Sequence, residues 1–389
     1  MIIKKVTVKS IYLMVAIIYL MQFSACTEER IDSNRKNITT LSHQNDIQSH
    51  NPTRNSKKYQ LSLTENLYVD AEVGMPKVGK ANILKVSDTI FDDKKLCKVF
   101  FQSKVYKNKK MGDGELFYVD DKKLSITEDK KIFDFSTSMK ENTDAIVFPT
   151  DSANIQRFSS RELDFMSKKK AIEIAADLVK SLGITPHMSP RVLSIDYKSL
   201  EKEQRRRLKE DGFQEYLKRG LVKIKDHLSK DDEFYYILFP IDMYGIPCDI
   251  SSYTDNPSGI PVDGSQIQIM ISKNGIEHCQ VNGIVYHEVG VKGNALPLIS
   301  VDQAINSIKK KYENIILTDL ATITNITLVY EPVLMKTTKD ENSEQVLYKE
   351  IELVPTWLFE IRQRPSSSRG DMVSESIVRI NAINGEEIF

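Results

Sequence analysis

Residues 266–289 read QIQIMISKNGIEHCQVNGIVYHEV, with one Asn-Gly pair at 274–275 and another at 282–283. Asn-Gly between apolar runs is the strongest short signal for a two-residue β-hairpin, because both turn residues adopt positive φ in the favoured turn. The flanking Ile, Val and Tyr residues have strong β propensity. We therefore predict three antiparallel strands at about 266–273, 276–281 and 284–289, joined as a meander.

The second Asn-Gly turn brings His278 and His287 together in this prediction. Residues equally distant from a two-residue turn face each other, with β-carbons about 5 Å apart. Two imidazoles at that spacing could share a metal ion. The pattern supplies no third ligand, since Cys279 and Glu288 point to the other face of the strands. We therefore favour structural or solvent-facing histidines and predict no metal and no cofactor.

Two amphipathic helices of the same kind lie among these strands. The first is predicted at about 168–182, with Ser167 as N-cap and Gly183 as its C-terminal stop. The second follows Ser300, whose spacing to Gln303 matches a capping box. Each has one apolar stripe suited to packing on a sheet. The pattern predicts the α+β class, with two lobes that each combine an antiparallel sheet and a packed helix.

Further strands and two further helices complete the predicted lobes. Asp92-Asp93 is expected to cap a short helix, and a highly charged helix is expected at about 199–217. The N-terminal lobe then spans residues 59–190 and the C-terminal lobe residues 191–389. A small antiparallel set is predicted within 112–136, with strands at 116–119, 124–127 and 132–135 separated by Asp/Lys turns. Other strands are predicted within 59–73 and at 83–86, 192–195, 234–243, 323–335, 346–361 and 377–383.

The N-terminus has the anatomy of a secretory signal. A basic region with Lys4, Lys5 and Lys9 precedes an uninterrupted apolar run at residues 11–21. A transmembrane helix needs roughly 20 apolar residues, so this run is too short to span a bilayer. We predict that residues 1–25 are a signal peptide that is cleaved.

Phe23-Ser24-Ala25-Cys26 resembles the lipobox of bacterial lipoproteins, although Phe23 stands where Leu is usual. The resemblance implies that Cys26 carries lipid, begins the mature chain and anchors it on the extracytoplasmic face of a bacterial cell membrane. The alternative is an ordinary signal peptide with a chance cysteine. Residues 26–58 are mostly polar and charged, which predicts a disordered tether of roughly 30 Å root-mean-square length.

Composition excludes some functional classes. The 389 residues carry 54 basic and 54 acidic side chains, so no net field attracts nucleic acid. The other cysteines, Cys97, Cys248 and Cys279, are too few and too widely spaced for a disulfide framework, although one pair with an odd cysteine stays open. No CxxC motif occurs, and we expect these three to be small buried residues.

Three C-terminal segments occur in a familiar order: PLISVDQAI at 297–305, VPTWLF at 354–359 and RINAINGE at 379–386. In this order they resemble PepSY-like domains and the related YycH/YycI regulators of a sensor kinase, over about residues 295–389. The resemblance implies a Ser-capped helix on an antiparallel sheet, and binding or regulation. The whole mature chain, with NLYVDAEV at 66–73, also resembles uncharacterised lipoproteins of anaerobic Gram-positive bacteria.

Catalytic signatures are largely missing from the sequence. His287-Glu288 lacks the second histidine of HExxH, and no GxSxG, Walker or GxGxxG loop occurs. Arg369-Gly370-Asp371 is most simply a chance tripeptide in a loop. Residues 199–225 carry nine Lys/Arg against five Asp/Glu, which is most simply a solvated helix, although an anionic partner could use it.

We therefore predict a non-enzymatic, lipid-anchored extracytoplasmic protein that binds or regulates a partner protein, peptide or cell-wall component. The alternative is a cell-envelope hydrolase with its site between the two lobes. Such a site is expected near the Gly-, Pro- and Ser-rich segment from Ser251 to Gly264. It would be a concave pocket lined by titratable groups with shifted pKa values.

Overall fold

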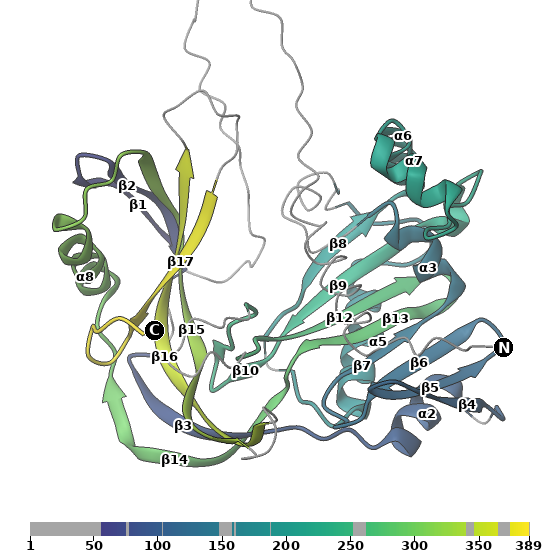
Figure 1. Cartoon of the computed structure of the whole chain (residues 1–389), viewed down its shortest axis with the longest axis horizontal. Helices are drawn as coiled ribbons and strands as arrows, with labels where there is room; N and C mark the ends of the chain where they lie inside the picture. Colours follow the sequence, from purple (N-terminus) through teal and green to yellow (C-terminus); the bar gives the residue numbers. More distant parts are fainter. Residues whose placement is uncertain are drawn as a thin grey trace, which may run out of the picture.

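The computed structural model describes residues 56–74, 78–102, 104–147, 158, 161–186, 188–251, 262–339, 346–364 and 374–388. The predicted signal peptide, Cys26, most of the predicted tether and Arg369-Gly370-Asp371 lie outside these ranges. Within them, no helix has both the length and the apolar character needed to cross a membrane. Figure 1 shows two large sheets side by side, with a short hairpin between them.

Sheet A is a curled, mixed sheet built from both ends of the described chain. Its strand order is β1-β2-β15-β16-β3-β14, and β17 also pairs with β16. β2 and β15 run parallel, while the other neighbours are antiparallel. The strands are β1 (Ser56–Thr64), β2 (Leu67–Gly74), β3 (Lys80–Asp88), β14 (Tyr286–Pro297), β15 (Leu320–Lys339), β16 (Val346–Arg364) and β17 (Ser374–Asn381).

Sheet B is antiparallel, with the strand order β4-β5-β6-β7-β13-β12-β9-β8. The hairpin of β10 (Asp242–Met243) and β11 (Ile246–Pro247) follows β9. The strands of sheet B are β4 (Lys107–Met111), β5 (Gly114–Val119), β6 (Lys122–Thr127), β7 (Phe133–Ser136), β8 (Arg191–Ile195), β9 (Phe234–Pro240), β12 (Ser265–Ser272) and β13 (Gly275–Gly283).

The predicted helix starts are confirmed at the level of single hydrogen bonds. Asp92 and Ser167 accept from the backbone N–H groups of Lys95 and Lys170, and Ser300 with Gln303 forms the capping box. The predicted charged helix is divided into α6 and α7. The helices are α2 (Asp93–Phe101), α3 (Ser138–Asp144), α5 (Lys168–Ser181), α6 (Tyr197–Arg207), α7 (Asp211–Lys218) and α8 (Val301–Glu313), with a 3-10 turn at Lys230–Asp232.

The α+β class is confirmed, but the two sheets are not assembled from consecutive halves of the chain. β1, β2 and β3 join the C-terminal strands in sheet A, and β4 to β7 join β8, β9, β12 and β13 in sheet B. The expectation that both sheets are antiparallel is wrong for sheet A, because β2 pairs in parallel with β15. Figure 1 shows the chain passing from one sheet to the other after β3 and again after β13.

The predicted meander is correct for its first hairpin and wrong for its second. β12 and β13 do pair, but their turn is Lys273-Asn274, one residue before the predicted Asn274-Gly275 turn. Gly275, with a φ of +110°, is the first residue of β13. β14, however, pairs with β3 in sheet A and not with β13. Gly283 has a φ of +84°, and the N–H of Ile284 donates to the carbonyl of Gly264 at 2.9 Å. The second Asn-Gly pair therefore marks the bend where the chain leaves sheet B.

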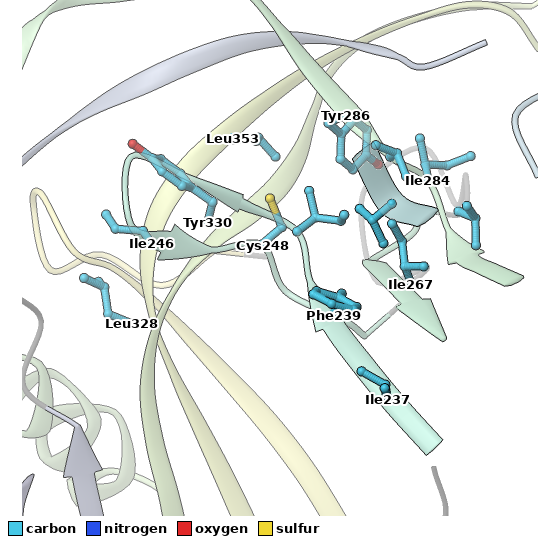
Figure 2. Close-up of a cluster of buried hydrophobic side chains, with 14 of the residues drawn as sticks. Ile237, Phe239, Ile246, Cys248, Ile267, Ile284, Tyr286, Leu328, Tyr330 and Leu353 are labelled. Carbon is cyan, nitrogen blue, oxygen red and sulfur yellow. The ribbon is translucent and has the colours of Figure 1, made fainter. Parts of the chain in front are cut away.

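A shared core joins the two sheets at this bend. Figure 2 shows Ile237, Phe239 and Ile267 of sheet B gathered with Cys248, Tyr330 and Leu353. These side chains belong to one continuous buried cluster. The hydroxyl of Tyr330 also donates to the carbonyl of Asn82 at 3.1 Å. Burial at roughly 25 cal/mol per Å² of apolar surface makes this junction a stabilising contact between the sheets.

Candidate functional site

One face of sheet B carries two neighbouring rows of side chains that cross the sheet from strand to strand. Directly paired residues point to the same face, so the strand register places each row. The first row is Lys107, Tyr118, Lys123, Ser136, His278, Met270, Tyr236 and Leu193. The second row is Lys109, Leu116, Ser125, Asp134, Gln280, Gln268, Leu238 and Arg191.

The opposite face of the same strands is apolar. Phe117, Leu124, Phe135 and Cys279 alternate with the residues of the two rows, and all four are buried. Phe100 of α2 stacks on Phe135 with ring centroids 4.3 Å apart. Because this face holds the core, the alternation of each strand sends the polar residues to the other side.

Exposure changes along the two rows. On β4, β5 and β6 the side chains of Lys107, Lys109, Tyr118, Lys123 and Ser125 are exposed. On β7 and β13 the face becomes half-buried, and on β12 and β9 it is covered. We name the part from β4 to β13 the polar face. Its members are Lys107, Lys109, Leu116, Tyr118, Lys123, Ser125, Asp134, Ser136, His278 and Gln280.

His278 lies at the buried end of the polar face. Its side chain is 1% exposed, and neither ring nitrogen has a hydrogen-bond partner among the described residues. Oδ1 of Asp134 lies 3.6 Å from Nε2 of His278. Beside it, the Tyr236 hydroxyl donates to Oε1 of Gln268 at 2.6 Å. Burying an imidazole without hydrogen bonds costs folding free energy, because its ring nitrogens lose their hydrogen bonds to water.

The electrostatics of this end follow from burial and charge. Burial lowers the pKa of His278 below its ordinary value, although Asp134 acts in the opposite direction. Partial burial acts to raise the pKa of Asp134, yet that pKa lies below its usual range because His278 and Lys140 favour the carboxylate. At neutral pH the pair is therefore a neutral imidazole beside a half-exposed carboxylate.

The structure separates the two histidines that the sequence brought together. His278 lies on β13 opposite Ser136 and Met270, whereas His287 lies on β14 opposite Ser87. The predicted pairing of His278 with His287 is therefore wrong, and the reason is the bend at Gly283. Among the described residues, no group of three or more His, Cys, Asp or Glu is arranged to hold a metal ion.

A second cluster of ionisable groups lies on sheet A beside the segment from Ser251 to Gly264. Nε of Arg379 on β17 is 2.9 Å from Oε1 of Glu331 on β15, and its Nη2 is 3.5 Å from Oδ2 of Asp249. The same Nη2 donates to the Ser251 hydroxyl at 3.1 Å. Burial and the charge of Asp249 raise the pKa of Glu331 well above its usual range.

This cluster is closed to solvent. The side chain of Glu331 is fully buried, and those of Asp249 and Arg379 are nearly so. Residues 252–261 of the predicted loop lie outside the described part of the chain. The hydrolase hypothesis requires a titratable group with a shifted pKa near that segment, and Glu331 is such a group. Glu331, Asp249 and Arg379 are, however, packed together in a buried, structural cluster.

The three cysteines in the described chain are free and buried, as expected. Burial raises the pKa of Cys97 to about 11 and raises the pKa values of Cys248 and Cys279 further. A thiol acts as a nucleophile only as the thiolate, so these residues are chemically inert at neutral pH.

Comparisons with known proteins give a likeness of fold. No protein-family model and no curated protein matches the chain. The structure is similar to the crystal structure of an uncharacterized protein from Eubacterium rectale ATCC 33656, with a TM-score of 0.63 and 16% sequence identity. The match covers 85% of this chain and 93% of the other. At this identity the similarity shows a shared fold.

Proposed function

We propose that the protein is a lipid-anchored, extracytoplasmic binding protein of the bacterial cell envelope, without catalytic activity. One observation carries the proposal: Ser24-Ala25-Cys26 directly follows a basic region and a short apolar run. A diacylglyceryl group on Cys26 would hold the mature chain on the membrane, because two or more acyl chains make a stable anchor. The polar segment from Thr27 to Asn55 would then separate the sheets from the bilayer.

The absence of a catalytic role is part of this proposal. The inert thiols of Cys97, Cys248 and Cys279 supply no nucleophile. The resemblance of about residues 295–389 to PepSY-like and YycH/YycI domains also favours binding or regulation. The partner would be a protein, a peptide or a cell-wall component. The polar face of sheet B supports such a role, because it is a broad surface with polar groups available for recognition.

An envelope hydrolase is the second candidate, and the raised pKa of Glu331 favours it. A carboxylic acid with a raised pKa can serve as a general acid. For this role Glu331 would have to be reached by substrate from the Ser251 to Gly264 side. Its complete burial in the ion pair with Arg379 makes binding the better-supported function.

Replacing Cys26 with alanine tests the anchor. We expect Cys26→Ala to lose all incorporation of a radiolabelled fatty acid and to leave the membrane fraction, because the acyl chains are the only anchor in the proposal. Cys97→Ala is the matched control, since it removes a buried cysteine and should keep the label. An unchanged membrane fraction and label in Cys26→Ala would overturn the lipid anchor.

A further inference from the structure

We infer that the polar face of sheet B is a binding site for an acidic glycan, an oligosaccharide that carries carboxylate or phosphate groups. The inference rests on the proposed function and names the ligand class for it. The face crosses from β4 to β13, roughly 19 Å at about 4.8 Å per strand. This width matches a short oligosaccharide lying across the strands.

The side chains of the face match the chemistry of sugars. A sugar ring has one apolar side that stacks on an aromatic ring, and Tyr118 is 37% exposed near the C-terminal end of β5. Sugar hydroxyls both donate and accept, and Ser125, Asp134 and Gln280 offer a hydroxyl, a carboxylate and an amide along one row. Leu116 is the one large aliphatic side chain among the ten residues of the polar face, and the others are mostly polar.

The charges of the face favour an acidic ligand. Lys107 and Lys109 project from β4 on this side, at the exposed ends of the two rows. Lys123 is paired with Glu141 of α3. Counted against the carboxylate of Asp134, the two β4 lysines leave the face with a surplus of one positive charge. Lysines on an outer strand also discourage pairing with another chain's strand, so recognition through the side chains is favoured over strand addition.

The inner end of the face offers a carboxylate that a ligand can reach. Asp134 is 39% exposed there, beside the buried side chain of His278. Asp134 also lines a pocket together with Leu116 and Ser125 of the same row. A sugar hydroxyl bound to Asp134 would therefore enter an existing hollow.

A glycan array tests the inference directly. The purified mature protein, without lipid, is applied to printed acidic glycans, neutral glycans and short peptides. We expect binding to at least one acidic glycan, weaker binding to its neutral counterpart, and weakening at high salt because exposed charges are screened. Tyr118→Ala should lower the affinity for that glycan about tenfold, and Asp134→Asn should lower it as well.

Matched controls and outcomes make the test decisive. Tyr68→Ala removes a tyrosine that is 40% exposed on sheet A, and it should bind as the unchanged protein does. Circular dichroism should show that all three variants are folded. Binding to peptides alone, binding to no acidic glycan, or binding unaffected by Tyr118→Ala and Asp134→Asn would each overturn the inference. Lipidation of Cys26 does not depend on glycan binding. A negative glycan result would therefore overturn the glycan site and leave the proposed lipid anchor untouched.

Discussion

Gly283→Ala is expected to lower the free energy of unfolding by about 3 kcal/mol or more. Gly283 has a φ of +84°, a conformation that a side chain rarely adopts. A Cβ atom added there would also overlap the backbone carbonyl oxygen of Gly264, which has no flexible end to move aside. Because the chain passes from sheet B to sheet A at this point, a shift of the bend would disturb the pairing of both sheets.

Gly290→Ala is the matched control for this prediction. Gly290 lies on β14, and a Cβ atom added to it meets nothing within 4 Å. Urea unfolding should therefore give a midpoint close to that of the unchanged protein for Gly290→Ala and a much lower one for Gly283→Ala. Equal midpoints for the two variants would show that the close approach of Gly283 to Gly264 does not determine the fold here.

Arg379→Met is expected to cost about 3 kcal/mol of unfolding free energy. Methionine keeps much of the volume but removes the cation that lies 2.9 Å from Glu331 and 3.5 Å from Asp249. The two buried carboxyl groups would then face each other without compensation. Protonation of Glu331 at lower pH removes part of this repulsion. The loss of unfolding free energy in Arg379→Met should therefore grow as the pH rises.

Arg362→Met provides the comparison. Nε of Arg362 is also 2.9 Å from a glutamate, Glu375, but both side chains are largely exposed. An exposed ion pair contributes at most about 1 kcal/mol, so this change should be nearly neutral. If thermal unfolding gave similar losses for Arg362→Met and Arg379→Met, burial would not be what makes the Glu331 cluster important.

Local features of the sequence predicted the helices well, because their determinants lie within a few residues. The caps at Asp92, Ser167 and Ser300 each use a side chain and a backbone N–H three positions further along. The short helix α2 buries Leu96, Cys97, Phe100 and Phe101. Their spacing of three to four residues is the pattern of a helix with one apolar face.

Strand neighbours were less predictable, because they depend on contacts between distant segments. The parallel pairing of Leu67 with Ala321 joins residues from the two ends of the described chain. Asn282-Gly283 has the composition of a hairpin turn, yet only its glycine has a positive φ, and it serves a bend between sheets. The same residue types satisfy both geometries, so the local pattern could not separate them.

The candidate site was predictable only in part. His278 stood out in the sequence, but its true neighbours Asp134 and Ser136 come from β7. Tyr118 lies in a strand that the sequence did predict, whereas Lys123 was expected in the turn before the next strand and belongs to β6. Nothing local indicates that either residue shares a face with His278. The cluster of Asp249, Glu331 and Arg379 likewise combines three distant segments.

The most direct test of the central claim is the mass of the N-terminal peptide of the protein purified from cell membranes. The proposal predicts a mature chain that begins at Cys26, with a peptide mass increased by a diacylglyceryl group on the Cys26 sulfur. A mature chain that begins at another residue, or an unmodified Cys26 in the membrane-bound protein, would contradict it.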